Sequence, residues 1–130
     1  MSKHKVVHFE IPASDFNKAK DFYGKVFGWG MQAWGDEYLM AMTTEVDKEQ
    51  KPTEMGGING GFYKRKADFP AQYPSLVIAV DDIGESMKKV TDGGGKVLGE
   101  PMEIPGIGTY VSFLDTEGNR VSMMQPLAGM

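Results

Sequence analysis

The sequence predicts an α+β fold, with two tandem βαβββ modules that form a curved sheet. The main observation is a repeat: a strand pattern, an aspartate, an amphipathic helix and a terminating glycine occur twice in the same order. Each landmark of the second copy lies 67 residues after its counterpart, as 82 − 15 shows for the two aspartates. The landmarks are His8, Asp15 and Gly28 in the first copy and Ser75, Asp82 and Gly95 in the second. Two copies of one unit imply an internal two-fold and a cavity between the halves.

Composition describes one globular domain of 130 residues, with 41% hydrophobic and 25% charged residues. The formal net charge of −4 argues against nucleic acid or an anionic membrane as a partner, because both attract basic surfaces. The chain contains no cysteine, which excludes disulfides, thiolate nucleophiles and sulfur-ligated zinc sites. Its first residues carry no apolar signal region, so we expect a cytoplasmic protein.

The first module begins with a strand whose side chains alternate between two faces. Val7, Phe9 and Ile11 face one way, whereas His8 and Glu10 face the other. An apolar face of this kind predicts contact with a helix, and the polar residues are then left on the opposite side of the sheet.

A helix follows this strand, capped by Ser14 or Asp15 and ended by Gly28 in a left-handed conformation. Its apolar stripe consists of Phe16, Ala19, Phe22, Tyr23, Val26 and Phe27. Three more strands are expected over residues 29–34, 38–44 and 56–63, with an exposed, charged loop over 45–54. The last of these strands has four glycines in eight residues, which is typical of a bulge or a close backbone approach.

The second module repeats this order after a hinge that contains Pro70 and Pro74. Asp82 caps its helix, and the apolar stripe consists of Ile83, Met87 and Val90. Its strands are expected over residues 75–80, 96–102, 109–114 and 120–125. The module bounds are therefore predicted as 5–64 and 74–126, within a single domain that spans residues 1–130.

Each predicted helix covers one face of its sheet only. Val7, Phe9 and Ile11 would support the first helix, and Leu76, Ile78 and Val80 the second. The opposite face must then be covered by solvent, a partner or a ligand. Two such sheets curved toward each other would make a concave site lined by aromatic side chains.

Three segments resemble the superfamily of glyoxalase I, bleomycin-resistance proteins and extradiol dioxygenases, the vicinal oxygen chelate proteins. They are HFEIPASDFNKAKDFYGKVFGW from His8, VDDIGESMKKVTDGGGKV from Val80 and FLDTEGNRVSMMQP from Phe113. The resemblance implies that two βαβββ modules pair into a half-barrel, either within one chain or across a swapped dimer. It also implies a homodimer and, in the metal-dependent members, one divalent metal held by His, Glu or Gln side chains.

Carried over to this chain, the resemblance leaves one good metal ligand. His8 occupies a ligand position, whereas Ser75 and Ser122 occupy two others, and Asn59 is the nearest oxygen donor at the fourth. Serine hydroxyls are poor ligands for divalent transition metals, so no cofactor is expected. The alternative is a site for nickel, zinc, iron or manganese, completed by Glu10 or Gln125.

No catalytic residue can be assigned from the order of residues alone. His8 could be a metal ligand, a general base, a hydrogen-bonding group for a ligand or a satisfied histidine under the sheet. Glu10 could share a proton with His8 or lie solvated at the rim. The predicted ligand-binding set is His8, Glu10, Trp34, Tyr38, Asn59, Phe62, Ser75, Tyr110, Ser122 and Met124.

Three functions remain open. We expect a metal-free protein, dimeric and similar to bleomycin-resistance members, that binds a small apolar or aromatic molecule. The first alternative is a metal-dependent lyase, isomerase or dioxygenase, and the second is a structural dimer with a vestigial cavity. The expected partners are a small-molecule ligand and a second copy of the chain, without nucleic acid or membrane.

Overall fold

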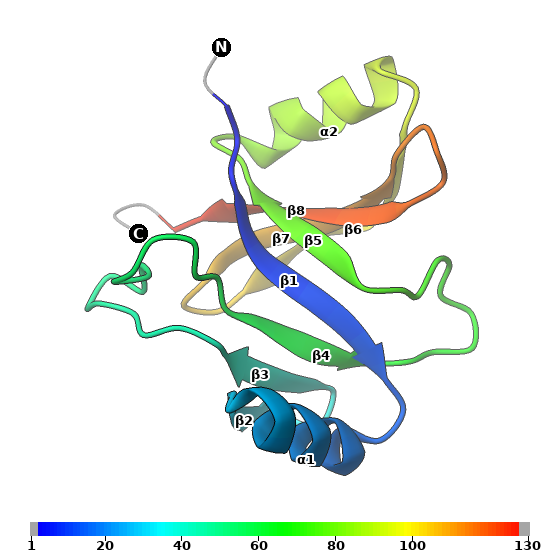
Figure 1. The fold of residues 1–130 in the computed structure, drawn as a ribbon. Helices are drawn as coiled ribbons and strands as arrows, with labels where there is room; N and C mark the ends of the chain where they lie inside the picture. Colours follow the sequence, from blue (N-terminus) through cyan, green and yellow to red (C-terminus); the bar gives the residue numbers. More distant parts are fainter. Residues whose placement is uncertain (1–2, 128–130) are drawn as a thin grey trace. The chain divides into compact units, whose positions relative to one another are not determined.

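The computed structural model describes residues 3–127, which form eight strands and two helices (Figure 1). In chain order the elements are β1 (Val6–Ala13), α1 (Phe16–Phe27), β2 (Gly30–Trp34), β3 (Tyr38–Met42), β4 (Gly60–Lys64), β5 (Ser75–Ala79), α2 (Ile83–Asp92), β6 (Lys96–Ile104), β7 (Gly108–Leu114) and β8 (Arg120–Pro126). The prediction of an α+β fold made of two βαβββ modules is confirmed.

The chain divides into two compact units. The first unit runs from His8 to Pro74, and the second runs from Ser75 onward and includes the segment before His8. This segment joins the second unit because the Lys5 carbonyl accepts a hydrogen bond from the Ala79 N–H at 2.9 Å. Each unit has its own buried cluster and is described by itself below.

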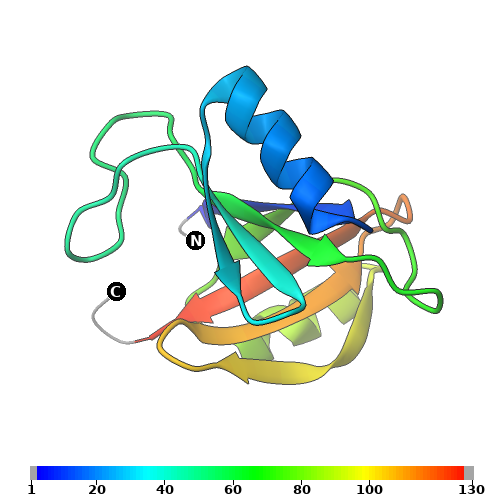
Figure 2. The ribbon, with the colours of Figure 1, turned by 90° about the horizontal axis from the view of Figure 1, so that it is seen from below.

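In the first unit the strand order is β2-β3-β4-β1, with β1 and β4 parallel and the other pairs antiparallel. Figure 2 shows α1 lying across one face of these strands. Asp15 caps the helix, since its Oδ1 accepts from the Lys18 N–H at 3.1 Å, and Gly28 ends it with φ 74°. The core under α1 consists of Ala13, Leu39, Ala41 and Phe62, with Phe9, Ile11, Phe16, Ala19, Tyr23, Trp29 and Met31 packed around them.

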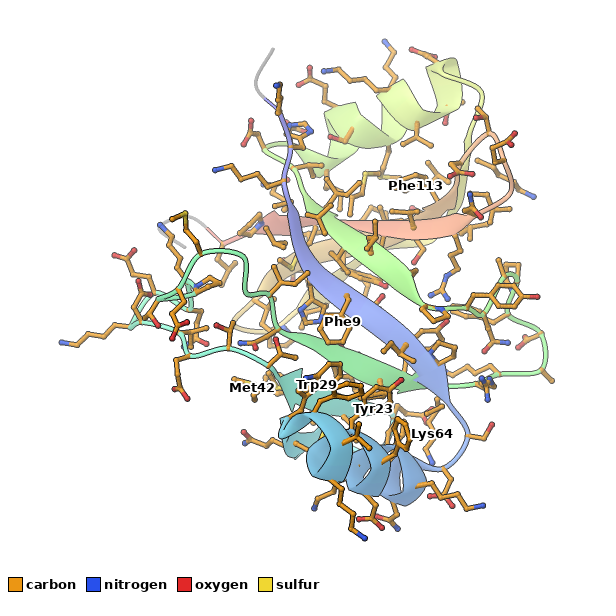
Figure 3. All side chains as sticks on the ribbon, viewed as in Figure 1. Phe9, Tyr23, Trp29, Met42, Lys64 and Phe113 are labelled. Atoms are coloured by element: carbon orange, nitrogen blue, oxygen red, sulfur yellow. The ribbon has the colours of Figure 1, made fainter. Side chains whose placement is uncertain are left out.

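Aromatic rings connect α1 to its sheet. The Tyr23 ring stacks on Trp29 with centroids 4.8 Å apart, and Trp29 meets Phe9 of β1 at 5.5 Å. Figure 3 shows these three side chains together between the helix and β1. Offset and tilted ring pairs at such distances add to the stability gained from apolar burial.

In the second unit the strand order is β5-β8-β7-β6, with β5 and β8 parallel and the other pairs antiparallel. Asp82 caps α2, since its Oδ1 accepts from the Glu85 N–H at 2.9 Å. The core under α2 consists of Val80, Ile83, Val111 and Met123, with Ile78, Met87, Val90, Val97 and Phe113 packed around them. The two units thus repeat one arrangement, in which a helix covers one face of four hydrogen-bonded strands.

Two predicted core contacts are wrong. Val7 and Leu76 have 38% and 45% of their surface exposed, so neither supports a helix as predicted. Both lie near the start of their strands, where alternation continues but the helix no longer covers the sheet. The glycine-rich strand is also shorter than predicted, because β4 begins at Gly60.

The segment 45–54 is exposed for the most part, as predicted, and it is locally ordered. Val46 and Pro52 form an antiparallel bridge, and Asp47 Oδ1 accepts from the Glu49 and Lys51 N–H groups. Neither helix in residues 3–127 combines the length and the hydropathy that crossing a membrane would require.

Candidate functional site

The predicted site residues lie mainly on the sheet face opposite the helix in each unit, which we call the helix-free face. Strand alternation places them there, because their neighbours in sequence fill the cores under α1 and α2. In the first unit this face carries His8, Glu10, Tyr38, Met40, Gly61 and Tyr63. In the second unit it carries Tyr110, Ser112, Arg120, Ser122 and Met124.

His8 and Tyr38 form a direct polar contact on the first unit's helix-free face. His8 Nε2 lies 2.8 Å from the Tyr38 hydroxyl oxygen, and the two rings are nearly parallel. Burial lowers the pKa of His8 from 6.5 to about 4, so the imidazole is neutral at pH 7. A neutral imidazole donates through one nitrogen and accepts through the other, so this contact holds in either tautomer.

Gly61 makes this contact possible. Tyr38 is on β3 and His8 is on β1, so the Tyr38 side chain must cross β4, which lies between them. A Cβ atom at Gly61 would overlap the Tyr38 ring. The neighbouring Gly60 has the same role on the other face, where a Cβ would overlap the Phe9 ring. The predicted close backbone approach in this strand is therefore the passage of an aromatic ring over each of two glycines.

Glu10 is buried on the same face, with 7% of its surface exposed. The sequence allowed Glu10 to lie solvated at the rim of the site, and this interpretation is wrong because the side chain is buried. The shared proton with His8 stays a prediction.

The second unit's helix-free face carries a chain of hydroxyl groups. Tyr110 and Ser122 are joined at 2.7 Å between their oxygens, and Ser122 and Ser112 at 2.8 Å. Arg120 Nη2 donates to Ser112 Oγ at 3.5 Å. We call these four residues the hydroxyl relay. Ser112, Ser122 and Arg120 are all at least nine-tenths buried, whereas Tyr110 is partly exposed.

The strand registers show which positions of the two units are equivalent. In the first unit Gly61 of β4 pairs with Glu10 on one side and with Met40 on the other. Tyr38 lies two residues before Met40 and therefore on the same face.

In the second unit Ser122 of β8 has the corresponding neighbours, Val77 and Ser112. Tyr110 lies two residues before Ser112, so it is the equivalent of Tyr38. Two tyrosines at matching positions therefore direct their hydroxyls to His8 in one unit and to Ser122 in the other. His8 and Ser122 are two of the four positions at which the sequence resemblance implies metal ligands.

Asn59, the third such position, is engaged by the backbone. Its Oδ1 accepts from the Thr43 N–H at 2.7 Å and from the Thr44 N–H at 2.9 Å. Thr43 in turn donates its hydroxyl to the Ile58 carbonyl at 2.5 Å. The Asn59 amide oxygen therefore holds the end of β3 against the start of β4.

Two predictions from the sequence are corrected. Phe62 is 1% exposed and packs under α1 against Tyr23, with ring centroids 5.2 Å apart, so it is a core residue and faces away from the helix-free side. Gln125, considered as an additional metal ligand, caps α2 instead, because its Oε1 accepts from the Ile83 N–H at 2.9 Å. The four glycines before Phe62 hid its register, since glycine gives no alternation signal.

The remaining predicted residues lie apart from these contacts. Trp34 is on β2 and is 49% exposed, and it pairs with Tyr38 across the strands. Ser75 is half-buried at the start of β5. Met124 is half-buried on β8 and pairs with Tyr110. Their role in ligand binding stays a prediction.

Comparison with known proteins decides the family. The family model of the Glyoxalase/Bleomycin resistance protein/Dioxygenase superfamily matches residues 5–123. The chain belongs to this superfamily. A glyoxylase-like domain-containing protein of Didymella fabae is 34% identical over 113 residues, which cover 85% of this chain and 84% of that protein. A probable lactoylglutathione lyase of Vibrio cholerae is 26% identical, over 96% of this chain and 93% of that protein.

Comparison with solved structures supports the fold. A hypothetical protein of Bacillus halodurans has a TM-score of 0.69 at 13% identity, with 99% of each chain covered. At this identity the similarity concerns the fold alone.

The superfamily includes metal-dependent members, and the residues of this chain do not fit such a metal. Three of the four candidate donors are already bound within their own units: His8 Nε2 to Tyr38, Ser122 Oγ to Tyr110 and Ser112, and Asn59 Oδ1 to two backbone N–H groups. The fourth, Ser75, offers only a hydroxyl, which is a poor ligand for a divalent transition metal. Among residues 3–127 no group of three or more His, Cys, Asp or Glu side chains is placed to hold a metal ion. No step through a metal is therefore derived.

Sequence reasoning missed three residues, Gly61, Ser112 and Arg120. A signal existed for two of them. The turn between β7 and β8 pairs Leu114 with Arg120, and counting back along the hairpin from this pair places Ser112 opposite Ser122. Gly61 gave no such signal, because its role depends on a tyrosine 23 positions earlier.

Proposed function

We propose that the protein binds a small apolar or aromatic molecule on its helix-free faces and does so without a divalent metal. The observation that carries this proposal is the matched pair of tyrosine hydroxyls at His8 and Ser122. Each tyrosine presents an aromatic ring and one polar atom, which suits recognition of a small ring compound. The methionines beside them, Met40 and Met124, add adaptable apolar surface.

A metal-dependent lyase is the second candidate, and it is favoured by the names of the Vibrio relatives. In that case His8 would have to release Tyr38 and recruit ligands beyond those assigned above. The third possibility, a structural dimer with a vestigial cavity, predicts that no small molecule binds.

Elemental analysis separates the first two candidates. We expect protein purified without chelator to contain well under one equivalent of nickel, zinc, iron or manganese. The metal content of the wild type is compared with that of the His8→Ala variant. A nearly stoichiometric metal in the wild type that His8→Ala abolishes would contradict the metal-free proposal.

A thermal-shift screen with a panel of small aromatic compounds separates binding from a purely structural role. A ligand that binds only the folded state raises the melting temperature in a concentration-dependent way. We expect such stabilisation for at least one compound, and a weaker effect in a Tyr38→Phe, Tyr110→Phe double variant. A panel without a single stabilising compound would favour the structural alternative.

We also propose that the chain forms a homodimer, as the sequence resemblance implies. Light scattering during size exclusion would test this. A mass near the monomer value of 14.3 kDa would contradict it.

A further inference from the structure

The sheet order ends at two strands, β2 and β6, and their outer edges differ in protection. An unpaired edge can add a strand from another chain, so proteins protect such edges with charges, proline or a bulge. β6 has all three, with Pro101, charges at Glu100 and Glu103, and a shift in register. β2 has the sequence GMQAW and pairs with β3 in one continuous register, without a charge or a proline. The outer edge of β2 is therefore unprotected.

The backbone groups on this outer edge belong to Met31 and Ala33. The Glu37 carbonyl accepts a hydrogen bond from β4 at 3.3 Å, so its backbone groups point toward β4. Direction alternates along a strand, so the backbone groups of Met40 point to the other side, where β2 pairs Gln32 with it. The two neighbours of Gln32 consequently direct their N–H and C=O groups away from the sheet.

A single antiparallel register lets a second copy use both residues. When Met31 of each copy lies opposite Ala33 of the other, two symmetric pairs form, and each exchanges two backbone hydrogen bonds. A shift toward α1 would need Trp29, whose N–H already donates to the Tyr23 carbonyl at 3.5 Å. A shift the other way would need Gly35, which lies in the turn after β2. The β2 edge is thus complementary to itself.

The side chains of β2 fit this register. Trp34 of one copy lies opposite Gly30 of the other, and a Cβ built at Gly30 would meet only the Met42 Cβ, at 3.6 Å, so an indole has room there. Trp34 is 49% exposed and therefore has apolar surface left to bury. Gln32 lies opposite Gln32 of the other copy, where the two amides can form hydrogen bonds.

Charges at the two ends of β2 are also complementary. Lys25 lies in the last turn of α1, before β2, and Asp36 lies in the turn after it. Both are exposed, and neither belongs to an ion pair among residues 3–127. Antiparallel pairing brings the start of one β2 beside the end of the other, so opposite charges meet at both ends of the contact.

We propose that β2 is a dimer interface, at which β2 of one copy pairs antiparallel with β2 of a second copy about a two-fold axis at Gln32. This inference rests on the homodimer proposed above and specifies its interface. Trp34 and Gln32 lie on the helix-free face, on the same side as Met40 and Tyr38. The second copy therefore adds its own Trp34 to the helix-free face of the first unit.

The test is a charge exchange at the two-fold axis, measured by sedimentation of the full chain over a range of concentrations. Gln32→Lys places two like charges opposite each other and should raise the dissociation constant of the dimer at least about tenfold, and Gln32→Glu should do the same. An equimolar mixture of the two variants should restore the dimer, because Lys then faces Glu. Gln50→Lys makes the same change of charge in the exposed 45–54 loop and is the matched control.

Ala33→Pro removes an outward N–H and leaves the hydrogen bonds to β3 in place, so it should weaken the dimer as well. Amide exchange at Met31 and Ala33 should be slow in the dimer and become fast on dilution. The Gln32 variants decide the outcome should Ala33→Pro not fold.

Two results would overturn the interface and differ in what they leave standing. A wild-type chain that is monomeric at every concentration would remove the homodimer and the interface together. A wild-type dimer that Gln32→Lys leaves intact, or a Lys and Glu mixture that does not associate, would remove the β2 interface alone. Neither result bears on small-molecule binding, which the thermal-shift screen tests separately.

Discussion

The helix-free faces of the two units have the same backbone plan and different chemistry. In the first, Tyr38 crosses Gly61 and meets a neutral histidine. In the second, the equivalent tyrosine meets a serine that is linked through Ser112 to a buried arginine. The tyrosine is present in both units, but its hydroxyl meets an imidazole in the first unit and a serine hydroxyl in the second.

The residue at the centre of each face explains the difference. Gly61 has no side chain, so the Tyr38 ring can lie over β4 and reach β1. Ser122, at the equivalent position, stops the second tyrosine with a hydrogen bond at β8. The two tyrosines therefore differ in reach: one hydroxyl meets a residue two strands away and the other a residue on the adjacent strand.

The largest expected effect is the pH dependence of stability, which belongs to the first unit alone. The pKa of His8 is about 4 in the folded state, against 6.5 for a histidine exposed to water as in the unfolded chain. Between these values the unfolded state binds the proton and the folded state does not, so the free energy of unfolding falls as pH falls through this window. The full loss, reached near pH 4 and below, is about 3 kcal/mol.

Urea unfolding between pH 4 and pH 7 measures this effect. His8→Gln should remove most of the pH dependence, whereas His4→Gln, the matched control at the other histidine, should leave it in place. An unchanged slope in His8→Gln would show that the burial of His8 is not its cause.

The second-largest expected effect is a loss of stability when the space that Gly61 leaves for the Tyr38 ring is filled. Gly61→Ala places a Cβ in the Tyr38 ring and should lower the free energy of unfolding by about 2 kcal/mol, since overpacking forces the ring to move. Gly24→Ala is the matched control, because a Cβ there meets only the Trp29 carbonyl at 3.7 Å. Gly24 lies in the last turn of α1, where replacing glycine by alanine should raise stability by up to about 0.5–1 kcal/mol.

The double variant Gly61→Ala, Tyr38→Ala should recover part of the loss caused by Gly61→Ala, because the clashing ring is gone. Losses that simply add in the double variant would contradict a direct contact between these two positions.

The sequence could predict the scaffold because each element carries its own local signals. Asp15 and Asp82 cap helices, Gly28 adopts φ 74°, and the turn after β7 is closed by Asp115. The hydrogen bond from the Asn119 backbone N–H to this carboxylate lowers the pKa of Asp115. Such contacts span a few residues and can be read from spacing.

The site depended on contacts that spacing cannot show. The faces of His8 and Glu10 followed from alternation, but the partner of His8 is 30 residues away, on a strand that is not its neighbour. Phe62 was misplaced for the same reason, because its strand contains too few side chains to reveal its register. A polar contact across an intervening strand depends on the tertiary arrangement, which a linear pattern does not specify.

The smallest expected effect compares the two tyrosines directly. Tyr38→Phe removes the hydroxyl partner of His8 Nε2 and should cost about 1 kcal/mol. Tyr110→Phe should cost about 0.5 kcal/mol, because Ser122 keeps its contact with Ser112 at 2.8 Å. Denaturant unfolding of both variants at pH 7 measures the difference.

The pH dependence then distinguishes the causes on the first face. The low pKa of His8 comes from burial, and Tyr38→Phe leaves the ring that buries it, so the variant should keep the wild-type slope between pH 4 and pH 7. Tyr110→Phe should keep it as well, because it alters only the second face. A slope that disappears in Tyr38→Phe would show that the phenol hydroxyl, rather than burial, keeps His8 neutral.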